Sequence, residues 1–313
     1  METLKIGTRG SKLALTQCGW VQRQIVAAMG ADPADAGDIA PLVVITTQGD
    51  LIQDRRLIEA GGKALFTKEI EDALLRGDID IAVHSLKDMP AVEIPGLSLC
   101  AIPVREDPRD AFVSVKYESI DDLPHGAKLG TASLRRQAQV LSHRPDLDIV
   151  MVRGNVDTRL RKLEAGECDG LLLAAAGLNR LGLGDRIRSF IDPDVHASAP
   201  GQGALAIQSR TGDLGAAWMD VIHHEETFLC VQAERGALEA LEASCRTAVG
   251  AFAKIDNGVM SFFVEALSSD GKVRWQRRAT LDAPTAESAR AMGLQLGDEI
   301  KAEAGPDLIQ AGM

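Results

Sequence analysis

The hydrophobic positions of the chain follow two spacings that alternate along its length. Short runs of β-branched and other apolar residues are separated by longer segments whose apolar residues recur every three or four positions. The first spacing is typical of strands and the second of amphipathic helices. The first third of the chain is therefore predicted to be an α/β unit, with helices at Leu13 to Met29 and at 67–76 and with strands at 4–8, 42–46, 79–83 and 97–102.

A second α/β unit is predicted after the polar stretch 103–109, which we interpret as a hinge. Its helices are expected to begin at Ser133 and at Val156. Its strands are expected at 111–115, 128–131, 148–152 and 169–174. A second flexible crossing at 197–203 then leads into a strand at 204–208.

The pattern changes again near residue 225. A long helix is followed by three alternating runs at 248–255, 259–266 and 273–280, and a last helix is expected at 286–302. The pairs Asn257-Gly258 and Asp270-Gly271 separate the runs and are typical of hairpin turns. The end of the chain is therefore predicted to be a small α+β domain with a three-stranded antiparallel sheet.

Length and composition narrow the functional classes. A chain of 313 residues is too long for one ordinary core, so two or three domains are expected. A net charge of −11 and an aromatic content of 4% argue against a nucleic-acid partner. No apolar run approaches the roughly 20 residues that span a bilayer, and no secretory signal is recognisable, so we expect no membrane partner and a cytoplasmic location. The five cysteines lack metal-site spacing, and no metal is expected.

The strand at 79–83 runs into a cluster of polar residues, His84, Ser85, Lys87 and Asp88, and Pro90 prevents a long helix from following directly. Ligands of open α/β sheets collect at the carboxyl ends of strands, so this cluster is a candidate reaction site. A solvated turn with a satisfied ion pair would explain the same residues equally well.

A second pattern occurs three times at the expected start of a helix. A small hydroxyl or amide residue accompanies arginine in the segments Thr8-Arg9-Gly10-Ser11, Ser133-Leu134-Arg135-Arg136 and Arg153-Gly154-Asn155. Free backbone N–H groups and the helix dipole favour anions there, and a guanidinium can pair with a carboxylate through two hydrogen bonds. The window 128–162 holds eight basic and three acidic residues, so a basic pocket for a polycarboxylate or phosphate ligand is predicted. A solvated helix face is the alternative, and it suits Arg161 and Lys162.

Taken together, the motifs resemble the porphobilinogen deaminase family. The matching segments, in chain order, are Gly7–Ser11 with Leu13–Leu15, Gly61–Lys63 with Phe66–Glu69, His84–Pro90, Arg105–Asp110, Thr131–Gln137, Arg153–Leu160, Ala199–Ala204, and Glu234-Arg235 leading to Cys245. They run in order over nearly the whole chain, so chance similarity is remote.

The resemblance implies two α/β lobes like those of periplasmic binding proteins and a small C-terminal α+β domain. The first lobe is expected to be discontinuous, at 1–103 plus 204–221, with the second at 109–197 and the third domain at 225–313. It also implies a dipyrromethane cofactor, joined by a thioether to Cys245. The implied reaction condenses four porphobilinogen molecules into linear hydroxymethylbilane with loss of ammonia, on a protein expected to be a monomer.

The same resemblance implies roles for individual residues. Asp88, assisted by Lys87, is expected to steady the cation that forms when porphobilinogen loses ammonia, and to move protons. Cofactor binding is implied for Lys87, Asp88, Ser133, Arg135, Arg136 and Arg159, besides the covalent bond to Cys245. Substrate binding is implied for Arg9, Ser11, Arg153 and Arg159.

Three positions depart from the family's usual pattern, namely Glu59, Ser244 and Ala248. They affect the charge of the 47–63 segment and the turn at Cys245, and they leave the implied chemistry unchanged. A non-catalytic two-lobed protein that binds or senses a polycarboxylate is the main alternative, and it has no need of Asp88 or of an attached pyrrole.

Overall fold

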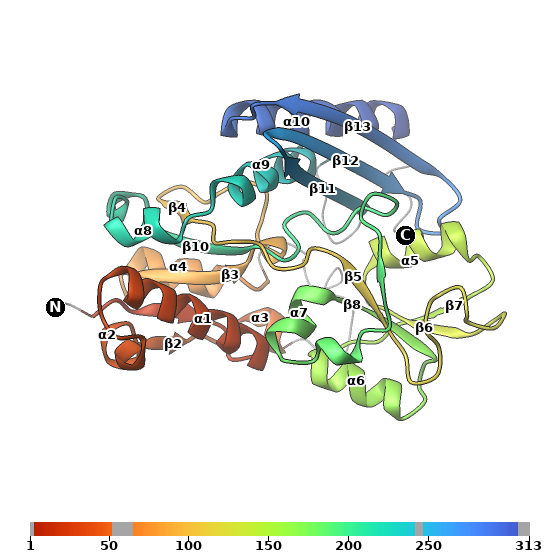
Figure 1. Cartoon of the computed structure of the whole chain (residues 1–313), viewed down its shortest axis with the longest axis horizontal. Coiled ribbons are helices and arrows are strands. Elements are labelled where there is room, and N and C mark those ends of the chain that lie inside the picture. Colours follow the sequence, from red (N-terminus) through yellow and green to blue (C-terminus); the bar gives the residue numbers. More distant parts are fainter. Residues whose placement is uncertain (1–2, 52–64, 242–246, 306–313) are drawn as a thin grey trace. The chain divides into compact units, whose positions relative to one another are not determined.

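The computed structural model describes residues 3–51, 65–241 and 247–305 (Figure 1). The chain divides into two compact units. Within the described residues, unit 1 comprises 3–51, 65–106 and 204–228, and unit 2 comprises 107–203 and 229–305. Cys245, Ser244, Glu59 and the segment Gly61–Lys63, all named above, lie outside the described residues.

Unit 1 is built on a mixed five-stranded sheet with the order β2-β1-β3-β10-β4. The central strand β3 is parallel to β1 on one side and antiparallel to β10 on the other. The strands are β1 (Ile6–Thr8), β2 (Leu42–Val44), β3 (Ile81–Ser85), β4 (Leu97–Ala101) and β10 (Leu205–Arg210). The chain therefore returns to this sheet after residue 203, as expected for a discontinuous first lobe.

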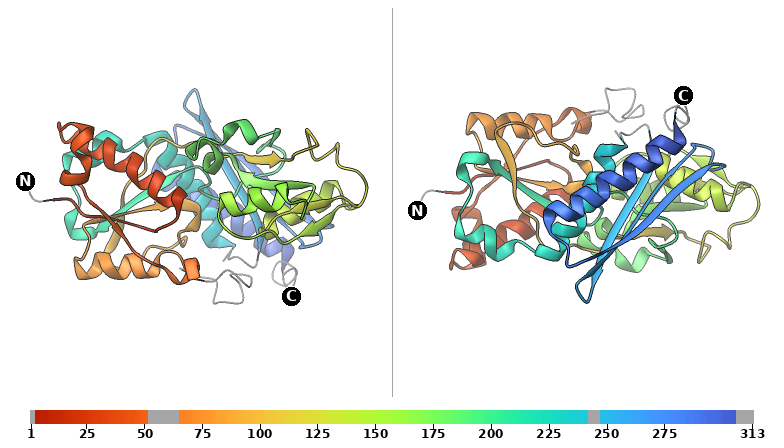
Figure 2. Two further views of the ribbon diagram at one scale, coloured as in Figure 1. Left: turned by 90° about the horizontal axis from the view of Figure 1, so that it is seen from below. Right: turned by 90° about the horizontal axis from the view of Figure 1, so that it is seen from above.

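Helices cover both faces of this sheet. The helices are α1 (Lys12–Ala28), α2 (Ala36–Ile39), α3 (Gln48–Leu51), α4 (Lys68–Arg76) and α8 (Ala217–Ile222). Ile81 and Val83 of β3 pack with Val21 and Ile25 of α1, whereas Ala82, between them, packs with α4. Figure 2 shows α1 (red) and α4 (orange) on opposite sides of the sheet. Both faces of β3 are therefore buried, which leaves its carboxyl end as the place where polar side chains can reach solvent.

Unit 2 contains a second sheet of the same design, with the order β7-β6-β8-β5-β9. Its strands are β5 (Asp110–Val113), β6 (Lys128–Gly130), β7 (Asp148–Val150), β8 (Gly170–Ala174) and β9 (Ser189–Ile191), and its helices are α5 (Leu134–His143), α6 (Val156–Glu164) and α7 (Ala175–Arg180). As in unit 1, the central strand has one parallel and one antiparallel neighbour, since β8 is parallel to β6 and antiparallel to β5.

The C-terminal part follows the predicted hairpin pattern. Its elements are α9 (Glu225–Ala240), which begins in unit 1 and continues into unit 2, β11 (Ala248–Asp256), β12 (Val259–Leu267), β13 (Arg274–Asp282) and α10 (Ala286–Ala304). The three strands form one antiparallel sheet, and Asn257 and Gly258 take φ values of 52° and 79° at the β11–β12 turn. Helices α10 and α9 pack closely at Gly293. A Cβ at this position would lie only 2.0 Å from the carbonyl oxygen of Ala233 in α9.

The expectation of two α/β lobes and a C-terminal three-stranded sheet is confirmed. The helix predicted at 67–76 begins after Thr67 and ends at Gly77, whose φ of 78° suits a residue without a side chain. The short elements α2, α3, α7, α8 and β9 were not predicted. In the described part of the chain, no helix is both long enough and apolar enough to cross a membrane.

Candidate active site

Lys87 and Asp88 are displayed at the carboxyl end of β3. The strand ends at Ser85 and passes into a 3₁₀ turn, Leu86–Asp88, closed by a hydrogen bond from Met89 N to the Leu86 carbonyl. Leu86 and Met89 are buried at 2% and 5% exposure, whereas the two residues between them are exposed. The apolar pair fixes the turn in the core and leaves Lys87 and Asp88 exposed on it.

His84 lies in the core rather than in the exposed polar cluster. It is 6% exposed, and its Nε2 atom has no hydrogen-bond partner among the described residues. Burial lowers the pKa of the imidazole to about 4; interaction with Gln208 opposes this shift and the charge of Arg9 adds to it. The ring is therefore neutral at physiological pH. Ser85 is also turned inward, and its hydroxyl donates to Oε1 of Gln17 at 3.1 Å.

The first of the three arginine segments forms a helix cap in unit 1. Ser11 is the N-cap of α1, and its Oγ accepts from the N–H of Ala14 at 3.2 Å. The guanidinium of Arg9 binds the carboxylate of Asp50 through Nε, at 3.1 and 3.2 Å, and through Nη2. It also lies 4.1 Å above the ring of Phe66. Burial raises the pKa of Asp50, but hydrogen bonds and charge from Arg9 outweigh this, and the pKa lies below its usual value.

The second segment caps α5 in unit 2, where Oγ of Ser133 accepts from the N–H of Arg136 at 3.4 Å. Arg135 and Arg136 are buried, at 5% and 6% exposure, and both pair with the carboxylate of Asp110, at 2.7 Å each. Burial alone would raise the pKa of Asp110. The charges and hydrogen bonds of the two arginines hold it well below its usual range.

The third segment caps α6, where Oδ1 of Asn155 accepts from the N–H of Thr158 at 2.8 Å. Nε of Arg159 donates to the carbonyl of Gly154 at 2.8 Å. Nη1 of Arg153 is buried and has no hydrogen-bond partner within the described ranges. A buried guanidinium nitrogen with unused hydrogen-bonding capacity suits an anionic ligand.

All three segments therefore start a helix as the sequence predicts, but each arginine environment differs. The partners Asp50, Phe66 and Asp110 belong to segments discussed above, yet no role was foreseen for them. Asp50 is 41 residues from Arg9 and Asp110 is 25 residues from Arg135, so local spacing carries no sign of either pair.

The described cysteines behave as structural thiols. Cys18, Cys168 and Cys230 are buried and Cys100 is half-buried. Burial raises the pKa of Cys18 to about 12 and that of Cys100 to about 11. These thiols keep their protons at neutral pH and are poor nucleophiles.

Among the departures from the family pattern, Ala248 opens β11 opposite Leu267.

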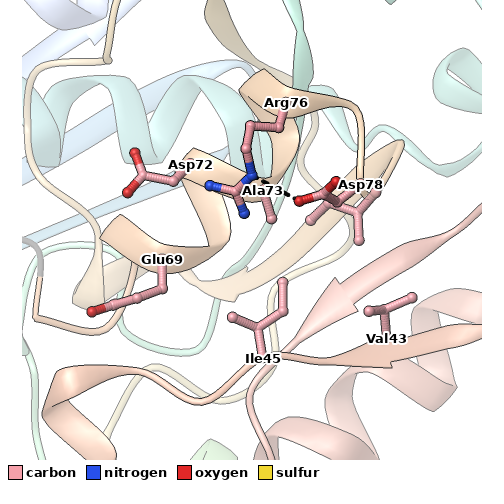
Figure 3. Close-up of a pocket in the computed structure, with 8 residues that line it drawn as sticks. Val43, Ile45, Glu69, Asp72, Ala73, Arg76 and Asp78 are labelled. Atoms are coloured by element: carbon pink, nitrogen blue, oxygen red, sulfur yellow. Dashed lines mark hydrogen bonds and ion pairs between the residues drawn. The ribbon is translucent and has the colours of Figure 1, made fainter.

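One hollow in unit 1 is unsuited to an acidic ligand. It has a volume of about 330 Å³ and lies beside α4, above an apolar floor that includes Val43 and Ile45 (Figure 3). Its rim carries Glu69, Asp72, Asp78 and Arg76, and Nε of Arg76 is already 2.8 Å from Asp78. The surplus of negative charge repels carboxylates, so we do not assign the chemistry to this hollow.

Comparison with known proteins gives matches along most of the chain. Residues 4–217 match the family model described as porphobilinogen deaminase, dipyromethane cofactor binding domain, and residues 228–302 match porphobilinogen deaminase, C-terminal domain. The chain is 58% identical over 312 residues to the porphobilinogen deaminase of Caulobacter sp. (strain K31), covering 98% of each chain. It is 56% identical over 313 residues to that of Phenylobacterium zucineum (strain HLK1), with 98% of each covered.

Among solved structures, the methionine-binding protein MetQ is similar over 72% of this chain and 92% of its own, at 15% identity and a TM-score of 0.45. A nutrient-binding protein from Burkholderia cenocepacia with bound methionine matches 70% of this chain and 90% of its own, at 15% identity and a TM-score of 0.41.

Proposed function

The chain belongs to the porphobilinogen deaminase family, and we propose that the residues named below serve that family's reaction. The reaction joins four porphobilinogen molecules into linear hydroxymethylbilane and releases ammonia at each addition. An enzyme that catalyses it is therefore also called a hydroxymethylbilane synthase. Residues 4–217 match the family model of the domain that binds the dipyrromethane cofactor. This cofactor is the primer to which the pyrrole units are added.

Asp88 is proposed as the catalytic carboxylate. Loss of ammonia from porphobilinogen leaves an electron-poor pyrrole with developing positive charge, which a nearby carboxylate stabilises. Asp88 is exposed on a turn whose neighbours Leu86 and Met89 are buried, so its carboxylate is accessible and its backbone is held in place. Lys87, on the same turn, supplies a positive charge for the acidic groups of the pyrroles.

The arginine segments are proposed to hold the acetate and propionate groups of the pyrroles. Arg9, Ser11, Arg153 and Arg159 are assigned to the substrate, and Ser133, Arg135, Arg136 and Arg159, with Lys87 and Asp88, to the cofactor. The single observation that carries this proposal is that three arginine-bearing segments each cap a helix N-terminus, through Ser11, Ser133 and Asn155. Helix N-termini and guanidinium groups favour the same ligand, an anion.

The residues present also fit the cofactor's charge. Among the described residues, Arg135 and Arg136 both pair with the single carboxylate of Asp110, so two positive charges meet one negative charge in a buried environment. Nη1 of Arg153 adds a buried donor without a partner in the described part of the chain. A ligand that carries several carboxylates meets both needs. Cys245 is proposed to attach this ligand through its sulfur.

Intact mass spectrometry of the purified protein separates this proposal from a solute-binding or sensing role. We expect a mass excess of two linked pyrrole units that is absent from Cys245→Ala, together with consumption of porphobilinogen by the wild type. Cys230→Ala, which removes a buried thiol, is the matched control and should keep the excess. An unmodified wild-type chain that still turns over porphobilinogen would refute the role of Cys245. A chain that binds porphobilinogen but never converts it would favour the binding protein.

We propose that the protein acts as a monomer in the cytoplasm and without a nucleic-acid partner. The net charge of −11 and the aromatic content of 4% support the last point. Light scattering of the loaded protein, with and without added RNA, tests both the monomer and the lack of a nucleic-acid partner.

A further inference from the structure

Two adjacent arginines of α5 converge on one carboxylate, although neighbouring helical residues point about 100° apart. Nη1 and Nη2 of Arg135 donate to Oδ2 and Oδ1 of Asp110 at 2.7 and 3.3 Å. Nε and Nη2 of Arg136 donate to Oδ1 at 3.0 and 2.7 Å. Asp110 is the first residue of β5 and is 4% exposed, so its position is fixed by the sheet.

Further contacts fix both guanidinium planes. Nη1 of Arg136 donates to the carbonyl of Leu172 at 3.0 Å, and Nη1 of Arg135 donates to Oε1 of Gln139 at 2.9 Å. Nε2 of Gln202 donates to Oδ1 of Asp110 at 2.8 Å, which anchors the carboxylate itself. The arginines are therefore held on several sides by groups whose own positions are set by sheet, helix and loop.

We propose that Asp110 is a positioning residue for the cofactor, which it holds indirectly by fixing the orientation of Arg135 and Arg136 and by leaving that pair one surplus positive charge. The inference rests on the proposed function, because it assumes that these two arginines bind the dipyrromethane. A guanidinium pairs with a carboxylate through two parallel hydrogen bonds only when its plane is correctly oriented. Without Asp110 the two cations repel each other and lose the acceptor that aligns them.

The same cluster continues away from the arginines, and this continuation provides a matched control. Nε2 of Gln139 donates to Oε1 of Glu265 at 2.7 Å, and Nε of Arg274 donates to Oε2 of Glu265 at 2.6 Å. Glu265 is fully buried, like Asp110, and it also pairs with a guanidinium of unit 2. It does not bond to Arg135 or Arg136, so Glu265→Gln removes a comparable buried charge while every bond between Asp110 and the two arginines is kept.

The test is a double-mutant cycle on the full-length chain, read by mass spectrometry as the rate at which unloaded protein gains two pyrrole units from porphobilinogen. We expect Asp110→Asn to slow loading about 10- to 100-fold, the equivalent of one charge-assisted hydrogen bond. In the Arg135→Lys, Arg136→Lys background the same substitution should slow loading less than about 3-fold, because a residue that acts through the arginines has nothing further to lose. Glu265→Gln should also change the loading rate less than about 3-fold, even if its melting temperature falls as far as that of Asp110→Asn.

Each contrary result has its own meaning. Any of three results would overturn the inference. They are wild-type loading in Asp110→Asn, an undiminished effect of Asp110→Asn in the lysine background, and an equal loss of loading rate in Glu265→Gln. Wild-type loading in the double lysine variant would overturn both the inference and the assignment of these arginines to the cofactor. If Asp110→Asn does not fold, Asp110→Glu replaces it, because it keeps the charge but shifts the carboxylate by one methylene. Slower loading at an unchanged melting temperature then supports positioning, and wild-type loading refutes it.

Discussion

The guanidinium of Arg9 is shared between the carboxylate of Asp50 and the ring of Phe66, with its Nε 3.1 Å from Oδ1 and its carbon 4.1 Å from the ring centroid. Asp50 is itself held by the hydroxyl of Thr47 at 2.8 Å. Arg9 is thus aligned before any ligand binds, although its side chain remains 23% exposed. A planar cation held in this way is suited to a second carboxylate at its exposed edge.

Arg9→Lys should therefore weaken substrate binding while the fold is retained. Lysine keeps the charge but loses the fork that forms two parallel hydrogen bonds, each worth about 1.5–3 kcal/mol when charge-assisted. We expect KM for porphobilinogen to rise about 10-fold or more, with a small change in melting temperature. Arg76→Lys is the control, because its pair with Asp78 is largely exposed and should not affect KM. Equal KM values for Arg9→Lys and the wild type would exclude Arg9 as a substrate ligand.

Asp88→Asn should abolish most turnover and spare the attached cofactor. The amide keeps the size of the carboxylate but cannot stabilise a cation or accept a proton, and a positioned acid–base group contributes about 10²- to 10⁴-fold. We expect kcat to fall at least about 100-fold while the two-pyrrole mass excess persists. Asp78→Asn, on the rim of the acidic hollow, should leave kcat unchanged. Loss of activity in Asp78→Asn and not in Asp88→Asn would move the reaction to that hollow.

Much of this site follows from local sequence rules. The helix caps at Ser11, Ser133 and Asn155 lie within three residues of the N–H groups that they accept, so short motifs are sufficient to predict them. The turn at Asn257-Gly258 is local in the same sense. The family resemblance then supplies the reaction, which no local rule gives.

The contacts that the sequence did not reveal all depend on the folded chain. His84 was placed in the polar cluster because it follows the strand predicted at 79–83, but β3 continues to Ser85 and helices cover both of its faces, which buries the ring. Arg135 and Arg136 were expected in a basic pocket for an anionic ligand, and no carboxylate of the chain itself was foreseen there, whereas both are buried against Asp110. The short elements α2, α3, α7, α8 and β9 lack the length at which periodicity becomes visible.

The buried imidazole of His84 should make the stability of the protein depend on pH. Its pKa is lowered from 6.5 to about 4, so the unfolded chain binds a proton between these values while the folded chain does not. Stability contributed by the neutral ring is therefore present above about pH 6.5 and is lost as the pH falls towards 4, by up to about 3 kcal/mol. His84→Gln should lack this component, and its free energy of unfolding should fall less between pH 7 and pH 4. An equal fall in the free energy of unfolding of the two proteins between pH 7 and pH 4 would contradict the assignment of this component to His84. The pKa of His196 is lowered as well, but its contribution is common to both proteins and cancels in the comparison.

Gly154 should be required for the geometry of the third arginine segment. Its φ is 113°, and a Cβ at this position would lie 2.7 Å from Cγ2 of Thr158, in the first turn of α6. Its carbonyl also accepts the hydrogen bond from Arg159. Gly154→Ala must therefore shift the backbone that joins Arg153 to the helix cap, and we expect a loss of stability of more than the roughly 1–2 kcal/mol that a left-handed residue costs by itself.

Gly166→Ala separates backbone strain from the clash. Gly166 also has a positive φ, of 77°, but a Cβ there would meet nothing within 4 Å. It should cost only the strain of about 1–2 kcal/mol and leave KM unchanged, whereas Gly154→Ala should raise KM because Arg153 and Arg159 are displaced together. Chemical denaturation and steady-state kinetics on both variants measure the two effects. If both variants lose the same stability and both keep the wild-type KM, Thr158 gives way to the added methyl group, and the loop before α6 does not set the position of these arginines.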